Sequence, residues 1–227
     1  MEAVVLAGGL GTRLRRVVTD LPKPMAPIGN KPFLEYILKY LEKNGIKRVI
    51  LSVGYKWEII QEYFGYEFEN IELIYSVEDE PLGTGGAIKK AMNQVENSQV
   101  YIINGDTFFD INLKTLDLKD KSKLILSLKH MTDFDRYGCV ENDENNLVTA
   151  FTEKSYRKSG NINGGIYLAS KDIFNEYDLD EKFSFEEFMQ ENFKKLQISS
   201  TIFDNYFIDI GIPEDYEKAQ SEIKNHI

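Results

Sequence analysis

Short apolar runs alternate with amphipathic segments along the first half of this chain. Residues 32–44 have helical periodicity, because Phe33, Ile37 and Leu41 share one face and Gly45 follows the last turn. Further helices are predicted at 56–64 and about 86–95, and apolar runs predict strands at 2–7, 48–53, 71–76 and 99–104. Strands that alternate with helices predict a parallel α/β sheet.

The second half is less regular. The pattern predicts helices at 184–195 and 213–224, and strands of mixed direction at 123–129, 137–141, 147–153, 161–168 and 197–203. The chain contains no internal repeat and no linker rich in Pro, Gly or Ser. We therefore expect a single α/β domain over residues 1–227, with a mostly parallel mixed sheet flanked by helices.

Three loops of unusual composition follow predicted parallel strands, at 8–27, 77–86 and 105–110. Right-handed crossovers bring such loops to one edge of the sheet. Ligands of open α/β sheets bind at the carboxyl ends of the strands, so these loops are the expected binding site.

The first loop reads Gly8-Gly9-Leu10-Gly11-Thr12-Arg13-Leu14 and continues to Pro22-Lys23-Pro24. Adjacent glycines turn backbone N–H groups toward an anion, and Arg13 and Lys23 supply charge for phosphate oxygens. A dinucleotide-binding G-x-G-x-x-G would need glycine where Leu14 stands, and the Gly-Lys-Ser/Thr of a Walker loop is absent. The alternative is a glycine-rich turn with solvated charges.

Composition narrows the function further. The net charge of −10 disfavours nucleic acid and anionic membranes as partners. Cys139 is the single cysteine, which excludes an internal disulfide and a cysteine-rich zinc site. The first residues predict a strand rather than a signal peptide, and no apolar run approaches the length of a membrane span, so we expect a cytoplasmic protein.

From the glycine loop onward, the chain resembles the sugar-phosphate nucleotidyltransferases. After G-G-x-G-T-R-L and P-K-P, the resemblance continues in order through Leu82-Gly83-Thr84-Gly85-Gly86, Gly105-Asp106, Glu153-Lys154, Asn163-Gly164-Gly165 and Asp209-Ile210-Gly211. Arg16, Ser155 and Ile212 depart from common family residues without removing a chemically active group. The resemblance implies a Rossmann-like nucleotidyltransferase fold, with a nucleotide-binding half at 1–110 and a sugar-phosphate-binding half at 111–227.

The resemblance also implies site residues. Those with catalytic roles are Arg13, Lys23, Asp106, Lys154 and Asp209. Those expected at the nucleotide are Leu6, Ala7, Gly8, Gly9, Gly11, Thr12, Arg13, Lys23, Glu80, Leu82, Gly83, Thr84, Gly85, Asn104, Gly105 and Asp106. Those expected at the sugar phosphate are Glu153, Lys154, Asn163, Gly164 and Gly165. Asp106 and Asp209 would hold one Mg²⁺ between them and the substrate phosphates.

Simpler interpretations exist for several of these residues. Asp106 and Asp209 could be turn formers at strand ends, Lys154 a strand-end partner of Glu153, and Thr84 a helix cap. Residues 81–88 resemble guanylyltransferases, which favours GTP as donor and a heptose 1-phosphate as acceptor. Mannose or glucose 1-phosphate, uridylyl or thymidylyl transfer, and a non-catalytic nucleotide-sugar-binding regulatory subunit are the alternatives. The chain could act as a homodimer.

Overall fold

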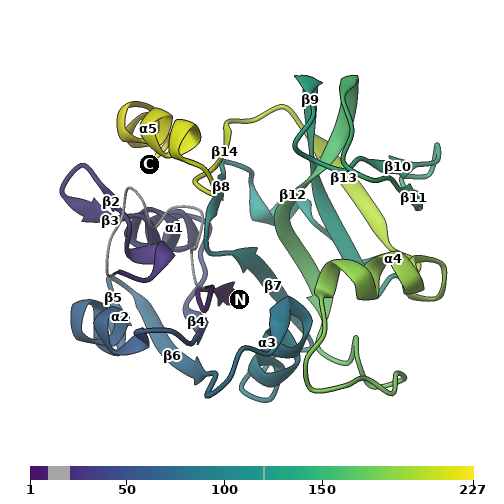
Figure 1. Cartoon of the computed structure of the whole chain (residues 1–227). Coiled ribbons are helices and arrows are strands. Elements are labelled where there is room, and N and C mark those ends of the chain that lie inside the picture. Colours follow the sequence, from purple (N-terminus) through teal and green to yellow (C-terminus); the bar gives the residue numbers. More distant parts are fainter. Residues whose placement is uncertain (10–20, 120) are drawn as a thin grey trace.

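The computed structural model describes residues 1–9, 21–119 and 121–227, and its centre is an eight-stranded sheet (Figure 1). In spatial order the strands are β13 (Ser199–Phe203), β9 (Leu124–Phe134), β12 (Arg157–Ser170), β7 (Gln99–Asn104), β1 (Glu2–Leu6), β4 (Arg48–Val53), β6 (Ile71–Val77) and β5 (Glu67–Phe68). β12 and β5 run antiparallel to their neighbours, and the other adjacent pairs are parallel. The predicted mostly parallel mixed sheet in a single α/β domain is confirmed.

Helices cover both faces of this sheet. Because side chains alternate along a strand, Ala3 and Val5 of β1 join one apolar cluster and Val4 joins the other. The first cluster packs against α1 (Phe33–Lys43), α2 (Trp57–Phe64) and α5 (Pro213–Glu222), and the second against α3 (Gly83–Met92) and α4 (Phe185–Leu196). The described residues also form 3₁₀ turns at η1 (Lys23–Met25), η2 (Leu113–Thr115) and η3 (Ile223–His226).

Within the part of the chain that the structure describes, three short strand pairs lie outside the main sheet. They are β2 (Pro27–Ile28) with β3 (Lys31–Pro32), β8 (Thr107–Phe109) with β14 (Phe207–Asp209), and β10 (Val140–Asn142) with β11 (Val148–Phe151). β8 and β14 were not predicted, because three residues are too few to show a strand period. Their pairing sets Asp209 opposite Thr107 and so joins the two predicted halves of the chain.

The predicted boundaries of three elements were wrong, and each error has a physical reason. α3 begins at Gly83 instead of about residue 86, although glycines disfavour a helix. The backbone N–H groups of Gly85 and Gly86 donate to Phe183 O, so this helix start is satisfied by a distant segment. β9 and β12 are longer than predicted, because they pair with each other beyond the apolar core, from Arg157 opposite Phe134 onward.

The strand order creates a crevice beside β1. After β1 the chain moves outward through β4 and β6, then returns to place β7 on the other side of β1. The strand order therefore reverses beside β1, which is the position where open α/β sheets bind ligands. None of the helices in the described ranges is long and apolar enough to cross a membrane.

Candidate active site

A cleft of about 590 Å³ opens at the carboxyl ends of β1, β6 and β7. It is the crevice expected from the strand order. The residues that line it are Leu6, Gly8, Gly9, Lys23, Pro24, Glu78, Pro81, Gly83, Thr84, Ala87, Asn104, Gly105, Asp106 and Glu186.

Most of the residues predicted at the nucleotide reach this cleft. Leu6, Gly8, Gly9, Lys23, Gly83, Thr84, Asn104, Gly105 and Asp106 line it. Ala7 is buried, and Leu82 and Gly85 adjoin lining residues without lining the cleft themselves. Glu80 is exposed and is not among the lining residues. Gly11, Thr12 and Arg13 lie outside the described residues.

Lys23 and Asp106 form the central ion pair. Lys23 Nζ lies 2.5 Å from Asp106 Oδ2, and the lysine side chain is 11% exposed against 37% for the aspartate. The flanking prolines and the hydrogen bonds Met25 N to Pro22 O and Ala26 N to Lys23 O fix the turn that carries the amine. A cation is thus held beside Asp106, which lies just beyond Gly105 at the end of β7.

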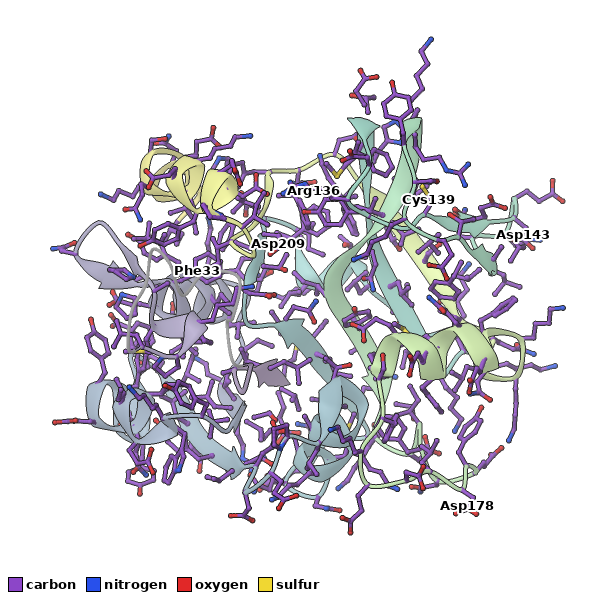
Figure 2. The ribbon with its side chains drawn as sticks, in the orientation of Figure 1. Phe33, Arg136, Cys139, Asp143, Asp178 and Asp209 are labelled. Atoms are coloured by element: carbon purple, nitrogen blue, oxygen red, sulfur yellow. The ribbon has the colours of Figure 1, made fainter. Side chains whose placement is uncertain are left out.

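Asp209 comes to the same place from the far end of the chain. Ile210 N donates to Asp106 O at 2.9 Å, and Gly211 N donates to Asp209 Oδ1 at 2.7 Å. A Cβ on Gly211 would lie 2.8 Å from Asp209 Oδ1 and 3.4 Å from Lys23 Nζ, so both charged groups crowd this glycine. In Figure 2, Asp209 lies between Phe33 on the α1 side and Arg136 near the β9–β12 side.

These two carboxylates suit a divalent cation whose other ligands come from a substrate. The described residues contain no group of three or more His, Cys, Asp or Glu side chains that could hold a metal alone. Magnesium is usually held by one or two carboxylates, with phosphate oxygens and waters completing its shell. The pairing of Asp209 with Thr107 brings Asp209 beside the segment that carries Asp106, which two independent turn formers would not need.

Tyr137 was not anticipated and stands near the same carboxylates. Burial raises the pKa of Tyr137 to about 12, and the negative charge of Asp209 adds to the shift. Its neighbour Arg136 donates from Nη2 to Asp215 Oδ2 at 2.6 Å, at the start of α5. The loop before β10 therefore contacts the segment that follows Asp209.

The glycines of residues 83–86 have a packing role that the sequence did not reveal. Gly83 has a φ of +72°, where a side chain is strained, and a Cβ there would lie 2.5 Å from Phe183 O. A Cβ on Gly86 would lie 2.2 Å from Glu181 O. These glycines let residues 181–183 lie directly against α3, while Gly83 and Thr84 face the cleft.

Thr84 does not cap its own helix, which corrects one simpler interpretation. The N-cap of α3 is Leu82, without a side-chain hydrogen bond. Thr84 Oγ1 instead accepts from Phe185 N and donates to Glu186 Oε2, each at 2.8 Å. Thr84 therefore connects α3 to the first turn of α4, and Glu186 becomes an unexpected member of the cleft.

Glu78 is a second carboxylate that sequence reasoning missed. Its Oε2 accepts from Leu82 N at 3.0 Å and its Oε1 from Ser52 Oγ at 3.3 Å. It lines the main cleft and also a neighbouring hollow beside Trp57, where Asp79 lies as well. Its position directly after β6 could have identified Glu78, because the ends of β6 and β7 lie at the same edge of the sheet.

The residues predicted at the sugar phosphate divide into two groups. Asn163 Nδ2 donates to the Tyr167 hydroxyl at 2.7 Å, and Gly165, at φ +73°, lies against the Asn104 side chain that borders the cleft. Gly164 packs closely on Phe109. Glu153 and Lys154 are exposed beyond β11 and do not line the cleft in this structure.

Comparison with known proteins gives consistent matches over the whole length. The chain is 62% identical over 216 residues to D-glycero-α-D-manno-heptose 1-phosphate guanylyltransferase from Campylobacter jejuni, covering 95% of this chain and 97% of that one. It is 53% identical over 231 residues to the enzyme of the same name from Aneurinibacillus thermoaerophilus, covering 100% of both chains. The crystal structure of HddC from Yersinia pseudotuberculosis, complexed with GMP-PN, superposes with a TM-score of 0.84 at 40% identity, covering 97% of this chain and 98% of that one.

A family-wide sequence model agrees with these individual matches. The model described as "Nucleotidyl transferase" matches residues 2–226. That range includes every element of the sheet and every residue of the cleft. The chain therefore belongs to the nucleotidyl transferase family and is a nucleotidyltransferase.

Proposed function

We propose that this enzyme transfers GMP from GTP to D-glycero-α-D-manno-heptose 1-phosphate, giving the GDP-sugar and pyrophosphate. One observation carries the chemistry: Lys23, Asp106 and Asp209 converge beside a glycine-lined cleft at the switch point of the sheet. The choice of GTP and heptose 1-phosphate is supported by the names of the relatives at 62% and 53% identity.

Enzymes of this family generally use a divalent metal, and we propose Mg²⁺ held by Asp106 and Asp209. The ion would neutralise charge on the triphosphate as pyrophosphate departs. Lys23, released from Asp106, would contact the α-phosphate under attack. The Gly8 and Gly9 backbone would approach the phosphates closely, and Arg13 would hold the β- and γ-phosphates.

No general base is required, because the attacking phosphate oxygen is already ionised at neutral pH. The two histidines lie elsewhere: His130 contacts Asn161 and Ser159, and His226 stacks on Tyr206. Catalysis would therefore rest on positioning two polyanions and stabilising the leaving group.

Glu78 is our proposed acceptor for the guanine base. Guanine offers N1–H and N2–H₂ donors, and a carboxylate can accept both. Glu78 lines the cleft with its oxygens oriented by Leu82 N and Ser52, whereas Asp79 and Glu80 are exposed. A base without these donors would bury the charged carboxylate with part of its hydrogen-bonding capacity unused and be strongly rejected.

The acceptor would enter from the other side of the cleft. We propose that residues 1–110 serve the nucleotide and residues 111–227 the sugar phosphate, with Asn163, Gly164 and Gly165 bordering the sugar. Glu153 and Lys154 would reach the sugar and its phosphate after the loop beyond β11 moves inward. We further propose a cytoplasmic enzyme, with no nucleic acid or membrane partner, that can form a homodimer.

The test is pyrophosphate release with a panel of GTP, UTP, CTP, ATP and dTTP against heptose, mannose and glucose 1-phosphates. The proposal expects the highest kcat/KM for GTP with heptose 1-phosphate, and loss of turnover in EDTA. Better use of another base or another sugar would reassign the substrate. Nucleotide binding without turnover on any pair would instead favour a regulatory subunit.

A further inference from the structure

Glu186 is a carboxylate of the cleft that none of the proposed steps uses. It lies in the first turn of α4, and its Oε2 accepts from Thr84 Oγ1 at 2.8 Å and from Ser184 Oγ at 3.1 Å. No described residue donates a hydrogen bond to its Oε1, and no described lysine or arginine pairs with it. The Thr84 and Ser184 hydroxyls thus orient the side chain through Oε2, and Oε1 remains available as an acceptor.

Glu186 lies between α3, on the proposed nucleotide side of the cleft, and β12, on the proposed acceptor side. Thr84 belongs to α3, which starts the nucleotide side of the cleft. On the opposite side, burial and then the negative charge of Glu186 raise the pKa of Tyr167, which places that carboxylate close to β12. The Tyr167 hydroxyl in turn accepts from Asn163 Nδ2 at 2.7 Å.

The charge of Glu186 decides which part of a substrate can lie against it. A phosphate would be repelled, because no described cation is paired with this carboxylate. A partly buried carboxylate favours neutral donors that replace its lost water, and the hydroxyl groups of a sugar are such donors. Glu186 lies on the side of Tyr167 and Asn163, where the acceptor is proposed to bind. The acceptor sugar therefore fits this position better than the ribose of the nucleotide does.

We propose that Glu186 accepts hydrogen bonds from hydroxyls of the acceptor sugar ring and so determines which sugar 1-phosphate is used. This inference rests on the proposed function, because it assumes a sugar 1-phosphate acceptor. Glu186 would select by hydroxyl position, since a sugar that turns its hydroxyl away leaves Glu186 Oε1 without a donor.

The experiment compares wild type with Glu186→Gln and Glu186→Ala under saturating GTP. The substrates are the accepted sugar 1-phosphate and its single-deoxy analogues at each ring hydroxyl. We expect kcat/KM for the intact sugar to fall about 10- to 100-fold in Glu186→Gln, with KM for GTP unchanged. One deoxy analogue should be poorly used by wild type and suffer no further loss in Glu186→Ala.

The matched control is Glu187→Gln, which removes one exposed carboxylate from the same helical turn and should leave all these values at wild type. Glu186→Asp keeps the charge and withdraws it by one methylene, so a reduced deoxy penalty in this variant tests the idea even if Glu186→Gln fails to fold. Thermal unfolding checks that each variant is native.

Two outcomes would overturn the inference. One is an unchanged penalty for every deoxy sugar in Glu186→Ala and Glu186→Asp; the other is a loss that follows deoxyribose forms of GTP instead of the sugar. Absence of turnover by wild type with every sugar 1-phosphate would refute the proposed function, which is a separate result.

Discussion

Removing the Lys23 amine should affect metal binding and turnover in opposite directions. Without nucleotide, a divalent cation at Asp106 must displace or lie beside the ammonium group that is now 2.5 Å from Oδ2. Lys23→Met keeps the length of the side chain and removes its charge. We therefore expect the variant to bind metal more tightly than wild type while its turnover falls.

The expected magnitude follows from the exposure of the pair. Lys23 is 11% exposed, but Asp106 is 37% exposed, so solvent screens the attraction and the full interior value does not apply. A contribution of about 1–2 kcal/mol lies between exposed pairs and buried charged hydrogen bonds. This corresponds to about 5- to 30-fold tighter metal binding in Lys23→Met. Loss of a preorganised cation at the reacting phosphate should lower kcat about 10²-fold or more.

The assay is titration with Mn²⁺ followed by electron paramagnetic resonance, in the absence of nucleotide, alongside pyrophosphate release with Mg²⁺. Lys39→Met is the matched control, because Lys39 pairs with Glu35 on α1 at 3.4 Å and does not line the cleft. The reasoning is refuted if Lys23→Met binds Mn²⁺ no more tightly than wild type, or if it turns over normally.

Three further predictions concern the carboxylate pair, the glycine motif and the opposite end of the sheet. Asp106→Asn and Asp209→Asn should each nearly abolish pyrophosphate release, and the double variant should be little worse, because the two act as a unit; additive losses would contradict this. Gly86→Ala should lower the Tm in calorimetry, although alanine normally favours a helix by about 1 kcal/mol, because its Cβ would lie 2.2 Å from a backbone oxygen; an unchanged Tm would show that residues 181–183 move aside easily. Burial tends to raise the pKa of Glu2, but hydrogen bonds from Asn97, Arg48 and Glu96 outweigh it and hold the pKa below its usual value. The stability from ionised Glu2 is present above the unfolded pKa of about 4.3 and is lost as pH falls through the folded pKa. Glu2→Gln should therefore lower the Tm at neutral pH and differ less from wild type in acid; a difference independent of pH would contradict it.

The parallel part of the fold could be predicted because its signals are local. Apolar runs at 48–53 and 99–104 coincide with β4 and β7, since strands buried on both faces show continuous apolar sequence. The pairing of β8 with β14 could not be predicted, because each strand is short and its partner lies about a hundred residues away. Asp106 and Asp209 were brought together by resemblance, and the strand pairing supplies the physical cause.

The missed carboxylates show a second limit. Helical periodicity predicted α4 and its apolar face, and Phe185, Phe188 and Met189 are indeed buried. The same period says nothing of Glu186, whose orientation depends on Thr84 from another helix. In the same way, the sequence offers three consecutive acids at 78–80, and only the fold shows that Glu78 turns toward the cleft.

The two ends of the sheet differ in how their carboxylates are satisfied, and this difference implies an order of binding. At the amino end, Glu2 is buried and held by Arg48 and by the backbone N–H groups of Glu96 and Asn97. At the carboxyl end, Glu78, Asp106 and Glu186 line one cleft, and Lys23 is the single cation among the described residues that line it. These described residues repel a free polyanion, and they attract a divalent cation only weakly because Lys23 competes for Asp106. A metal–nucleotide complex overcomes both effects, because its phosphates draw Lys23 away from Asp106 and its cation binds the carboxylates. The nucleotide with its metal should therefore bind before the sugar 1-phosphate, whose own negative charge needs the Lys23 side of the cleft to be already neutralised.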